Sequence, residues 1–307
     1  MDIAATAFDE MPTALIAELE GAGLDADDVY AQVVRALAED VPTEDVTSVP
    51  TIPASDRGVA DFVTREPGTV AGLAIAELVF RYVLGAAVRV ERPVADGEAV
   101  AARTTVLTVY GATRSLLIAE RTALNFLCHL SGVATGTARW VAALEGTSAR
   151  VRDTRKTIPG WRRMEKYAVR CGGGVNHRES LSDQALIKDN HVLAAGGVVA
   201  AYRAVQQRYA DAQPPLPIQV EVDSLDQLRE LLEIGVDSIL LDNMTPDQLA
   251  QAVRLSDGRA TLEASGGLTL ESAAAVAATG VDFIAVGALT HSAKVYDIGM
   301  DLRPDGA

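Results

Sequence analysis

The sequence predicts an α/β protein in which an N-terminal α+β region is followed by a short α/β barrel. Up to about residue 119, helical and strand-like runs follow one another without a fixed period. From residue 150, apolar strands alternate with amphipathic helices, and each strand ends in polar residues or glycine. Four of these ends, Glu221, Asp242, Ser265 and Gly287, are spaced by 21, 23 and 22 residues. A strand-plus-helix repeat of this length is typical of α/β barrels.

The N-terminal region is predicted to mix helices with locally paired strands. Pro12 suits a helix start, and the acids from Asp25 to Asp28 suit the first turn of a second helix within residues 1–40. Residues 41–56 are rich in Pro, Thr, Ser and Asp and predict an extended loop. The expected strands are Gly58–Thr64, Thr69–Gly72, Ala87–Arg92, Thr104–Tyr110 and Thr113–Ala119, with a hairpin turn at Gly111-Ala112. Helices are expected at Ala74–Leu84 and Glu120–Leu144.

Six barrel strands can be recognised, so the predicted barrel falls short of eight. They are Arg150–Thr154, Ala185–Lys188, Ile218–Val222, Ser238–Leu241, Thr261–Ala264 and Phe283–Val286. The helices between the later strands are expected at Ser224–Ile234, from Thr245-Pro246 onward, and at Leu270–Thr279. Because the C-terminal ends of such strands meet at one mouth, the residues that follow them predict the site.

The amino-acid composition limits the classes of partner that the protein can bind. The 307-residue chain has a net charge of −15, which argues against nucleic acid or an anionic membrane as a partner. No apolar run approaches the length of a membrane span, and the acidic start does not resemble a signal peptide. We therefore expect a cytoplasmic protein. Cys128 and Cys171 are the two cysteines, and they indicate neither a disulfide framework nor a zinc site.

Residues 151–191 form a cationic island in this acidic chain, with nine Lys and Arg against five Asp and Glu. The chain has four lysines against 23 arginines, and Lys156, Lys166 and Lys188 all lie in this stretch. An ammonium is a compact charge suited to phosphate, whereas guanidinium matches carboxylates. The island therefore predicts a small anionic ligand.

Carboxylates and cations are predicted to share the barrel mouth. Glu221 and Asp242 end neighbouring strands, and two carboxylates together with phosphate oxygens suit Mg²⁺. The alternative, that one carboxylate merely pairs with Lys188, stays open. Asp153 to Lys156 follow the first strand. Three glycines, residues 172–174, precede His177 and Arg178, which together with Arg155 predict a carboxylate pocket.

Two glycine-containing turns end the last strands, Ser265-Gly266-Gly267 and Gly287 to His291. Glycines there allow backbone N–H groups to approach a phosphate closely. Late barrel strands are a recurrent phosphate-binding position.

These motifs closely resemble those of the quinolinate phosphoribosyltransferase family. The matching segments are Asp153–Thr157, Pro159-Gly160, Lys166–Val169, Gly172–Gly174, Asn176–Arg178, Ile187–His191, Glu120–Asn125, Ser131–Thr135, Glu221–Asp223, Leu241–Asn243 and Ser265–Gly267. They are long, specific and spread over nearly the whole chain. Trp161 departs from the family pattern, where an aliphatic residue is expected, and this departure bears on packing beside the site.

The resemblance implies an N-terminal α/β sandwich domain, residues 1–130, joined by the C-terminal tail 292–307, and an open α/β barrel at 131–291. It implies a homodimer in which each site is completed by the partner chain. It also implies that quinolinate and phosphoribosyl pyrophosphate react, with Mg²⁺, to nicotinate mononucleotide, CO₂ and pyrophosphate in NAD biosynthesis.

The family pattern also implies roles for individual positions. Arg121 would complete the partner's quinolinate pocket, and Arg155, His177 and Arg178 would surround the two quinolinate carboxylates. The predicted catalytic residues are Lys156, Lys188, Glu221 and Asp242, with Glu221 and Asp242 on the metal and ribose. The phosphate and remaining substrate contacts are expected at Thr154, Ser265, Gly266, Gly267, Val286, Gly287, Ala288 and His291.

Three other functions fit parts of this pattern. A barrel lyase or aldolase would form a Schiff base at Lys156 or Lys188, but it leaves the carboxylate pocket unexplained. A sister phosphoribosyltransferase would act on nicotinate, although Arg155 with His177 and Arg178 favours two carboxylates over one. A non-catalytic scaffold has no need of carboxylates at strand ends beside a cationic pocket.

Overall fold

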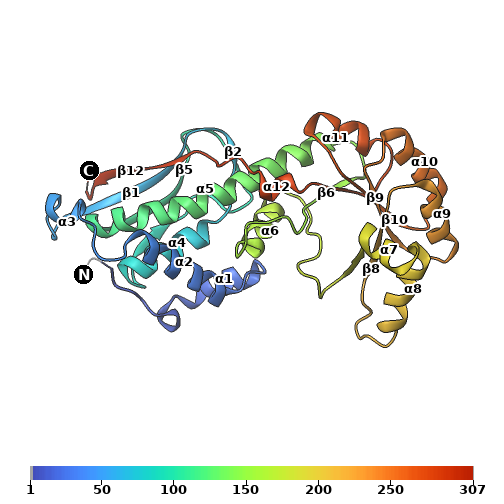
Figure 1. Ribbon diagram of the computed structural model, residues 1–307. Coiled ribbons are helices and arrows are strands. Elements are labelled where there is room, and N and C mark those ends of the chain that lie inside the picture. Colours follow the sequence, from blue (N-terminus) through green and yellow to red (C-terminus); the bar gives the residue numbers. More distant parts are fainter. Residues whose placement is uncertain (1–2, 307) are drawn as a thin grey trace. The chain divides into compact units, whose positions relative to one another are not determined.

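A computed structural model describes residues 3–306 and divides them into two compact units (Figure 1). The first unit comprises the chain up to Gly136, the segment Arg163–Gly173 and the segment from Ala293 onward. The second comprises Thr137–Arg162 and Gly174–Ser292.

The first unit begins with a short 3₁₀ turn, η1 (Phe8–Glu10), and two helices, α1 (Thr13–Gly21) and α2 (Ala26–Asp40). Both predicted helix starts are confirmed. Pro12 occupies the N-cap of α1, and the Asp25 carboxylate caps α2 by accepting a hydrogen bond from the Asp28 N–H at 3.1 Å. The segment predicted as an extended loop contains one turn of helix, α3 (Ser48–Thr51).

An antiparallel sheet with the order β12-β1-β5-β3 forms the body of this unit. Its strands are β1 (Arg57–Thr64), β3 (Arg89–Glu91), β5 (Thr105–Ala112) and β12 (Ile298–Pro304), while β2 (Gly68–Thr69) pairs separately with β4 (Ala99–Val100). The C-terminal strand β12 pairs with β1 along its whole length. Helix α4 (Leu73–Leu84) packs on β5, and Phe62 and Phe80 meet edge to face in the core with ring centroids 5.5 Å apart.

The predicted strand at Thr113–Ala119 is wrong, because these residues form the first turns of helix α5 (Thr113–Ala143). The buried side chains of Leu116, Ala119, Ala123, Leu127 and Leu130 recur every three or four residues. This period is helical, and the helix continues from Thr113 without a break. Gly111-Ala112 therefore ends β5 rather than turning a hairpin.

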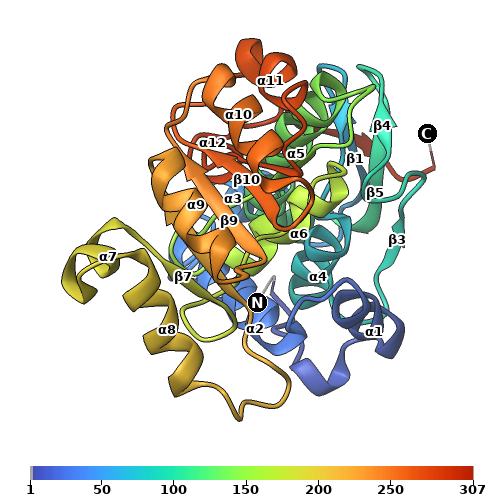
Figure 2. The same cartoon turned by 90° about the vertical axis from the view of Figure 1, so that its right-hand side faces the viewer.

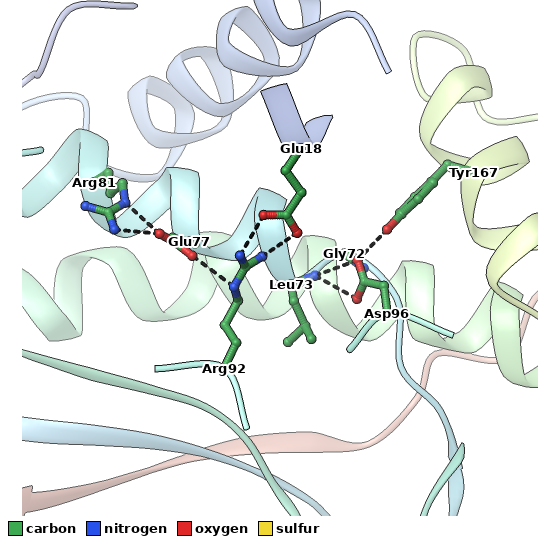
Figure 3. Close-up of polar contacts among 8 residues, drawn as sticks. All are labelled: Glu18, Gly72, Leu73, Glu77, Arg81, Arg92, Asp96 and Tyr167. Atoms are coloured by element: carbon green, nitrogen blue, oxygen red, sulfur yellow. Dashed lines mark hydrogen bonds and ion pairs between the residues drawn. The ribbon is translucent and has the colours of Figure 1, made fainter. Parts of the chain in front are cut away.

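Helix α6 (Arg162–Cys171) belongs almost entirely to the first unit, although residues 131–291 were predicted to form the barrel as one segment. Its Tyr167 hydroxyl donates to the partly buried Asp96 carboxylate at 2.5 Å (Figure 3). Asp96 also accepts hydrogen bonds from the N–H groups of Gly72 (3.0 Å) and Leu73 (3.1 Å), and so caps α4. Burial raises the pKa of Asp96. These contacts explain why α6 packs in the first unit, although it lies inside the segment predicted to form the barrel.

A second polar cluster lies beside this cap in Figure 3. Arg92 donates to both carboxylate oxygens of Glu18, and its Nε lies 3.1 Å from Glu77. Glu77 is buried and is also paired with Arg81 one helical turn away on α4. Arg92, which follows β3, thus joins Glu18 on α1 to the buried Glu77 on α4.

The second unit is built on a six-stranded parallel sheet, as predicted, with the order β6-β11-β10-β9-β8-β7. The strands are β6 (Arg150–Arg152), β7 (Ala185–Ile187), β8 (Ile218–Val222), β9 (Ser238–Asp242), β10 (Thr261–Ser265) and β11 (Phe283–Ala285). Strands β6 and β7 are the two edges, so the sheet is an open barrel. At the β6 edge a single parallel bridge joins Arg152 to Val175.

Helices flank this sheet, as the view in Figure 2 shows for α9, α10 and α11. The predicted helices correspond to α9 (Leu225–Glu233), α10 (Pro246–Ser256) and α11 (Leu270–Ala277), capped by Ser224, Thr245 and Thr269. Three helices of the second unit were not predicted: α7 (Asp189–Ala195), α8 (Val198–Arg208) and the single turn α12 (Ala288–His291). Within residues 3–306, none of the helices has the length and apolar character that a membrane span requires.

Candidate active site

The C-terminal ends of the parallel strands bring the predicted residues of the second unit to one edge of the sheet. Ser265 on β10 lies directly opposite Asp242 on β9, and Glu221 on β8 lies opposite Leu240. Thr154, Arg155 and Lys156 follow β6, while Lys188 follows β7. The barrel period alone thus explains why residues far apart in sequence meet at one mouth.

Asp153 anchors a second segment at this mouth. Its carboxylate is fully buried and accepts hydrogen bonds from the His177 N–H at 2.7 Å and from Asn176 Nδ2 at 2.6 Å. Its own N–H donates to Val175. A buried carboxylate needs such donors, and here they come from the chain that leads to Arg178. Arg155 lies two residues after Asp153 in the sequence. By holding residues 176–177, Asp153 therefore places Arg178 close to Arg155.

Arg155 and Arg178 are near enough to repel each other. Burial and the positive charge of Arg155 lower the pKa of the Arg178 guanidinium. Arg178 donates to the Gln184 carbonyl at 3.0 Å, while the buried Nε of Arg155 has no hydrogen-bond partner among the described residues. Arg162 holds the loop of Arg155 by donating to Thr157 Oγ1 at 3.1 Å. Two guanidinium groups held together can donate hydrogen bonds to a ligand with two carboxylates.

The carboxylates Glu221 and Asp242 lie beside two lysines. Lys188 Nζ forms an ion pair with Glu221 Oε2. Burial, followed by the negative charge of Glu221, raises the pKa of Asp242, while the charges of Lys188 and Lys156 act in the opposite direction. Asn243 Nδ2 donates to Asp242 Oδ2 at 2.6 Å. The four charged groups from four strands are thus electrostatically coupled.

The turn after β10 depends on its glycines. Gly266 and Gly267 both have positive φ, of 95° and 59°. A Cβ on Gly266 would lie 2.2 Å from Asn243 Oδ1 and 2.9 Å from the Asn243 nitrogen, whereas a Cβ on Gly267 would meet nothing within 4 Å. The two glycines therefore have different reasons to be there. Gly266 is required for close packing, while Gly267 is required only for its backbone conformation.

The turn after β11 lies against the loop of Lys156. A Cβ on Gly287 would come within 3.0 Å of Lys156 Cδ and 3.2 Å of His291 Nε2. Thr290, in the turn α12 that begins with Ala288, donates through Oγ1 to the Lys156 carbonyl at 2.7 Å. The Val286 N–H donates to the Arg152 carbonyl at 2.8 Å. These contacts place the second glycine turn next to a cation suited to phosphate.

Two family models match this chain. A model described as the quinolinate phosphoribosyl transferase C-terminal domain matches residues 133–301, and the N-terminal domain model of the same name matches residues 45–131. A curated protein of Mycobacterium leprae, the nicotinate-nucleotide pyrophosphorylase [carboxylating], is 53% identical over 87% of this chain and 95% of its own.

The chain belongs to the quinolinate phosphoribosyl transferase family. Solved family structures have the same fold. The nicotinate-nucleotide pyrophosphorylase of Francisella tularensis is 38% identical, with a TM-score of 0.85 over 90% of this chain and 96% of its own. NadC from Streptococcus pyogenes is 39% identical, with a TM-score of 0.86 over 92% and 98%.

His177 and Arg121, which the family pattern assigns to substrate binding, are placed differently from the other predicted site residues. The His177 imidazole is buried, with both ring nitrogens in hydrogen bonds within the protein. Arg121 lies on α5 in the first unit, and its side chain is 62% exposed. Their predicted contacts with substrate stay predictions.

Sequence reasoning missed polar groups beneath the mouth, chiefly Gln219 and Glu263, which the strand pattern assigns to an apolar layer. The available signal was a single carboxylate in the strand Thr-Leu-Glu-Ala-Ser. A cavity of about 300 Å³ in the second unit is lined by Arg178, His191 and apolar side chains, chiefly of β7, α7 and α8. A larger groove of about 800 Å³ in the first unit contains none of the predicted site residues.

Replacing the two glycines of the β10 turn should separate their roles. Gly267→Ala should lower the free energy of unfolding by about 1 kcal/mol, because only the left-handed backbone is strained. Gly266→Ala should lower it by about 3 kcal/mol, because the methyl group also displaces Asn243. Chemical denaturation of both variants measures the difference. Equal losses would contradict the packing role of Gly266.

Proposed function

We propose that the chain transfers the phosphoribosyl group of phosphoribosyl pyrophosphate to quinolinate, with release of CO₂. The products are nicotinate mononucleotide and pyrophosphate, a step of de novo NAD biosynthesis. The observation that carries this proposal is the pair of mutually repelling guanidinium groups, Arg155 and Arg178, held beside two lysines and two carboxylates. The activity named for relatives that match 86–87% of this chain supports it.

Quinolinate would bind through its two carboxylates at Arg155 and Arg178. Each guanidinium can donate two parallel hydrogen bonds to a carboxylate. A dianion also removes the repulsion between the two cations, so its binding is favoured over that of nicotinate, which has one carboxylate. Arg155 brings a buried Nε with no partner among the described residues, and a ligand carboxylate would satisfy it.

Phosphoribosyl pyrophosphate would bind across the other strand ends. Lys156 and Lys188 are compact cations suited to its pyrophosphate. For Lys188 to contact it, the ion pair with Glu221 has to loosen, which frees the Glu221 carboxylate for the ribose hydroxyls. The turns at Ser265–Gly267 and at Gly287-Ala288 would present backbone N–H groups to the 5′-phosphate, with Thr154 and His291 nearby.

Mg²⁺ is part of this proposal. Glu221 and Asp242 fit it, because the negative charge of each destabilises the other and a cation would relieve this effect. The described residues contain no group of three or more His, Cys, Asp or Glu side chains suited to hold a metal, so the substrate would have to supply the remaining oxygens. When bound, the ion would neutralise the charge of the leaving pyrophosphate.

The chemistry then needs position and electrostatics from the protein. As the bond between ribose C1 and pyrophosphate breaks, positive charge develops on the ribose, and the carboxylate of Glu221 can stabilise it. The quinolinate nitrogen forms the new bond to C1. Once the nitrogen is quaternary, the ring accepts the electron pair of the departing 2-carboxylate, and a proton replaces CO₂ at that carbon. Arg155 and Arg178 hold the ring in line for the first step.

We also propose that the active form is a homodimer in which Arg121 reaches the partner's quinolinate pocket. An arginine that is 62% exposed, on a helix whose inner face is apolar, is available for such a contact. We propose the cytoplasm as the compartment, since both cysteines are free and a reducing environment keeps them so.

The direct test uses quinolinate labelled with ¹⁴C in the 2-carboxylate. Release of labelled CO₂ should require phosphoribosyl pyrophosphate and Mg²⁺ together, and omission of any one component should reduce it to background. Each omission reaction is the control for the others. If nicotinate is converted but quinolinate releases no labelled CO₂, the protein is instead a phosphoribosyltransferase that acts on nicotinate. Absence of turnover with both substrates would overturn the proposal.

Mixing two inactive variants tests the shared site. Arg121→Ala and Lys156→Ala homodimers should each be nearly inactive, because each lacks one part of every site. After dissociation and reassociation of an equal mixture, about half of the dimers are mixed, and one of their two sites is intact, so activity should return to about a quarter of wild type. No recovery, with mixed dimers demonstrated by mass spectrometry, would contradict the role of Arg121.

A further inference from the structure

A chain of polar side chains crosses the inside of the barrel beneath the mouth, in a layer that is usually apolar. Arg152 on β6 donates to Glu263 Oε2 on β10 at 2.7 Å, and Gln219 Nε2 on β8 donates to the same oxygen at 3.1 Å. Gln219 Oε1 lies 3.0 Å from His177 Nε2. Because side chains alternate along a strand, Gln219 and Glu263 lie one step below Glu221 and Ser265.

The direction of every hydrogen bond in this chain is fixed by the carboxylate. Ionised Glu263 can only accept, so Gln219 has to present its amide N–H to Glu263 and its oxygen to His177. The His177 ring must then donate from Nε2. Its Nδ1 is consequently a bare acceptor, and it receives the Arg178 N–H at 2.7 Å. A proton on Nδ1 would face that N–H and break the bond.

This arrangement is unfavourable for stability alone. Glu263 is fully buried, and its Oε1 has no hydrogen-bond partner among the described residues, although His177 Nε2 is 3.5 Å away. Arg152 Nε is also unsatisfied, while its guanidinium stacks on Phe283 at 4.0 Å. Burying an ion pair with incomplete partners is expensive compared with an apolar layer. Its position directly beneath the site suggests a functional reason.

We propose that Glu263 is a positioning residue that, through Gln219, holds His177 in its neutral Nε2–H tautomer and thereby fixes the backbone of Arg178. In this view the His177 imidazole supports the pocket from within and is not itself a substrate ligand. The guanidinium of Arg178 is aimed by two contacts, its N–H to His177 Nδ1 and its Nη1 to the Gln184 carbonyl. The substrate part of this inference rests on the proposed function, whereas the tautomer does not.

The test combines a spectroscopic and a kinetic measurement on the full-length protein. ¹⁵N-labelled histidine reports the tautomer of each imidazole, and the signal of His177 is assigned by its loss in His177→Asn. Glu263→Gln keeps the shape of the side chain but removes the negative charge that fixes the directions of the hydrogen bonds from Arg152 to His177. Gln219→Met keeps the Arg152–Glu263 ion pair and breaks only the link to His177. Glu230→Gln, an exposed position on α9, is the matched control.

The wild type and Glu230→Gln should show a single Nε2–H tautomer for His177. Glu263→Gln and Gln219→Met should show a mixture of tautomers or a protonated ring. Their KM for quinolinate should rise by at least about fivefold, while their KM for phosphoribosyl pyrophosphate changes by less than about twofold.

The proposal is overturned if folded Glu263→Gln and Gln219→Met keep the wild-type His177 tautomer, or if both KM values rise together. If Glu263→Gln does not fold, Gln219→Met decides the question alone. The tautomer is read without substrate, so a failure of the proposed reaction would still leave this measurement decisive.

Discussion

The buried carboxylate of Asp153 is the constraint on which the site depends. Asp153 directly follows β6, and its two carboxylate oxygens accept hydrogen bonds from the backbone N–H of His177 and the amide of Asn176. Strand ends alone would gather Arg155, Lys188 and the two carboxylates. They would not bring in residues 176–178, which follow a helix of the other unit. One fully buried carboxylate, satisfied by donors from this segment, joins the two halves of the cationic pocket.

The site holds like charges close together, and their repulsion shifts the pKa values of its side chains. The pKa of Arg178 is lowered in part by Arg155, and the pKa of Asp242 is raised in part by Glu221. Repulsion of this kind is destabilising until a ligand of opposite charge arrives. Such a pocket favours a dianion, in agreement with the quinolinate in the name of the family to which the chain belongs.

The barrel was predictable because its signal is periodic, and the first unit was less so because its signal is not. The regular return of polar strand ends predicts six strands, whereas the run from Thr113 contains a Leu-Leu-Ile segment that is compatible with both a strand and a helix. The place of α6 could not be foreseen, because it depends on the contact of Tyr167 with Asp96, which are 71 residues apart. Likewise, the roles of Glu263 and Gln219 depend on hydrogen-bond partners on other segments of the chain, which the sequence pattern does not reveal.

The most direct test of this account is the binding of quinolinate, measured by calorimetry without phosphoribosyl pyrophosphate. Arg155→Ala should weaken it by about 2–4 kcal/mol, as for removal of one preorganised donor, and should affect nicotinate less. Arg203→Ala, an exposed arginine on α8, should bind both ligands as the wild type does. Unchanged quinolinate affinity in Arg155→Ala would contradict the central claim that the paired guanidinium groups form a receptor for two carboxylates.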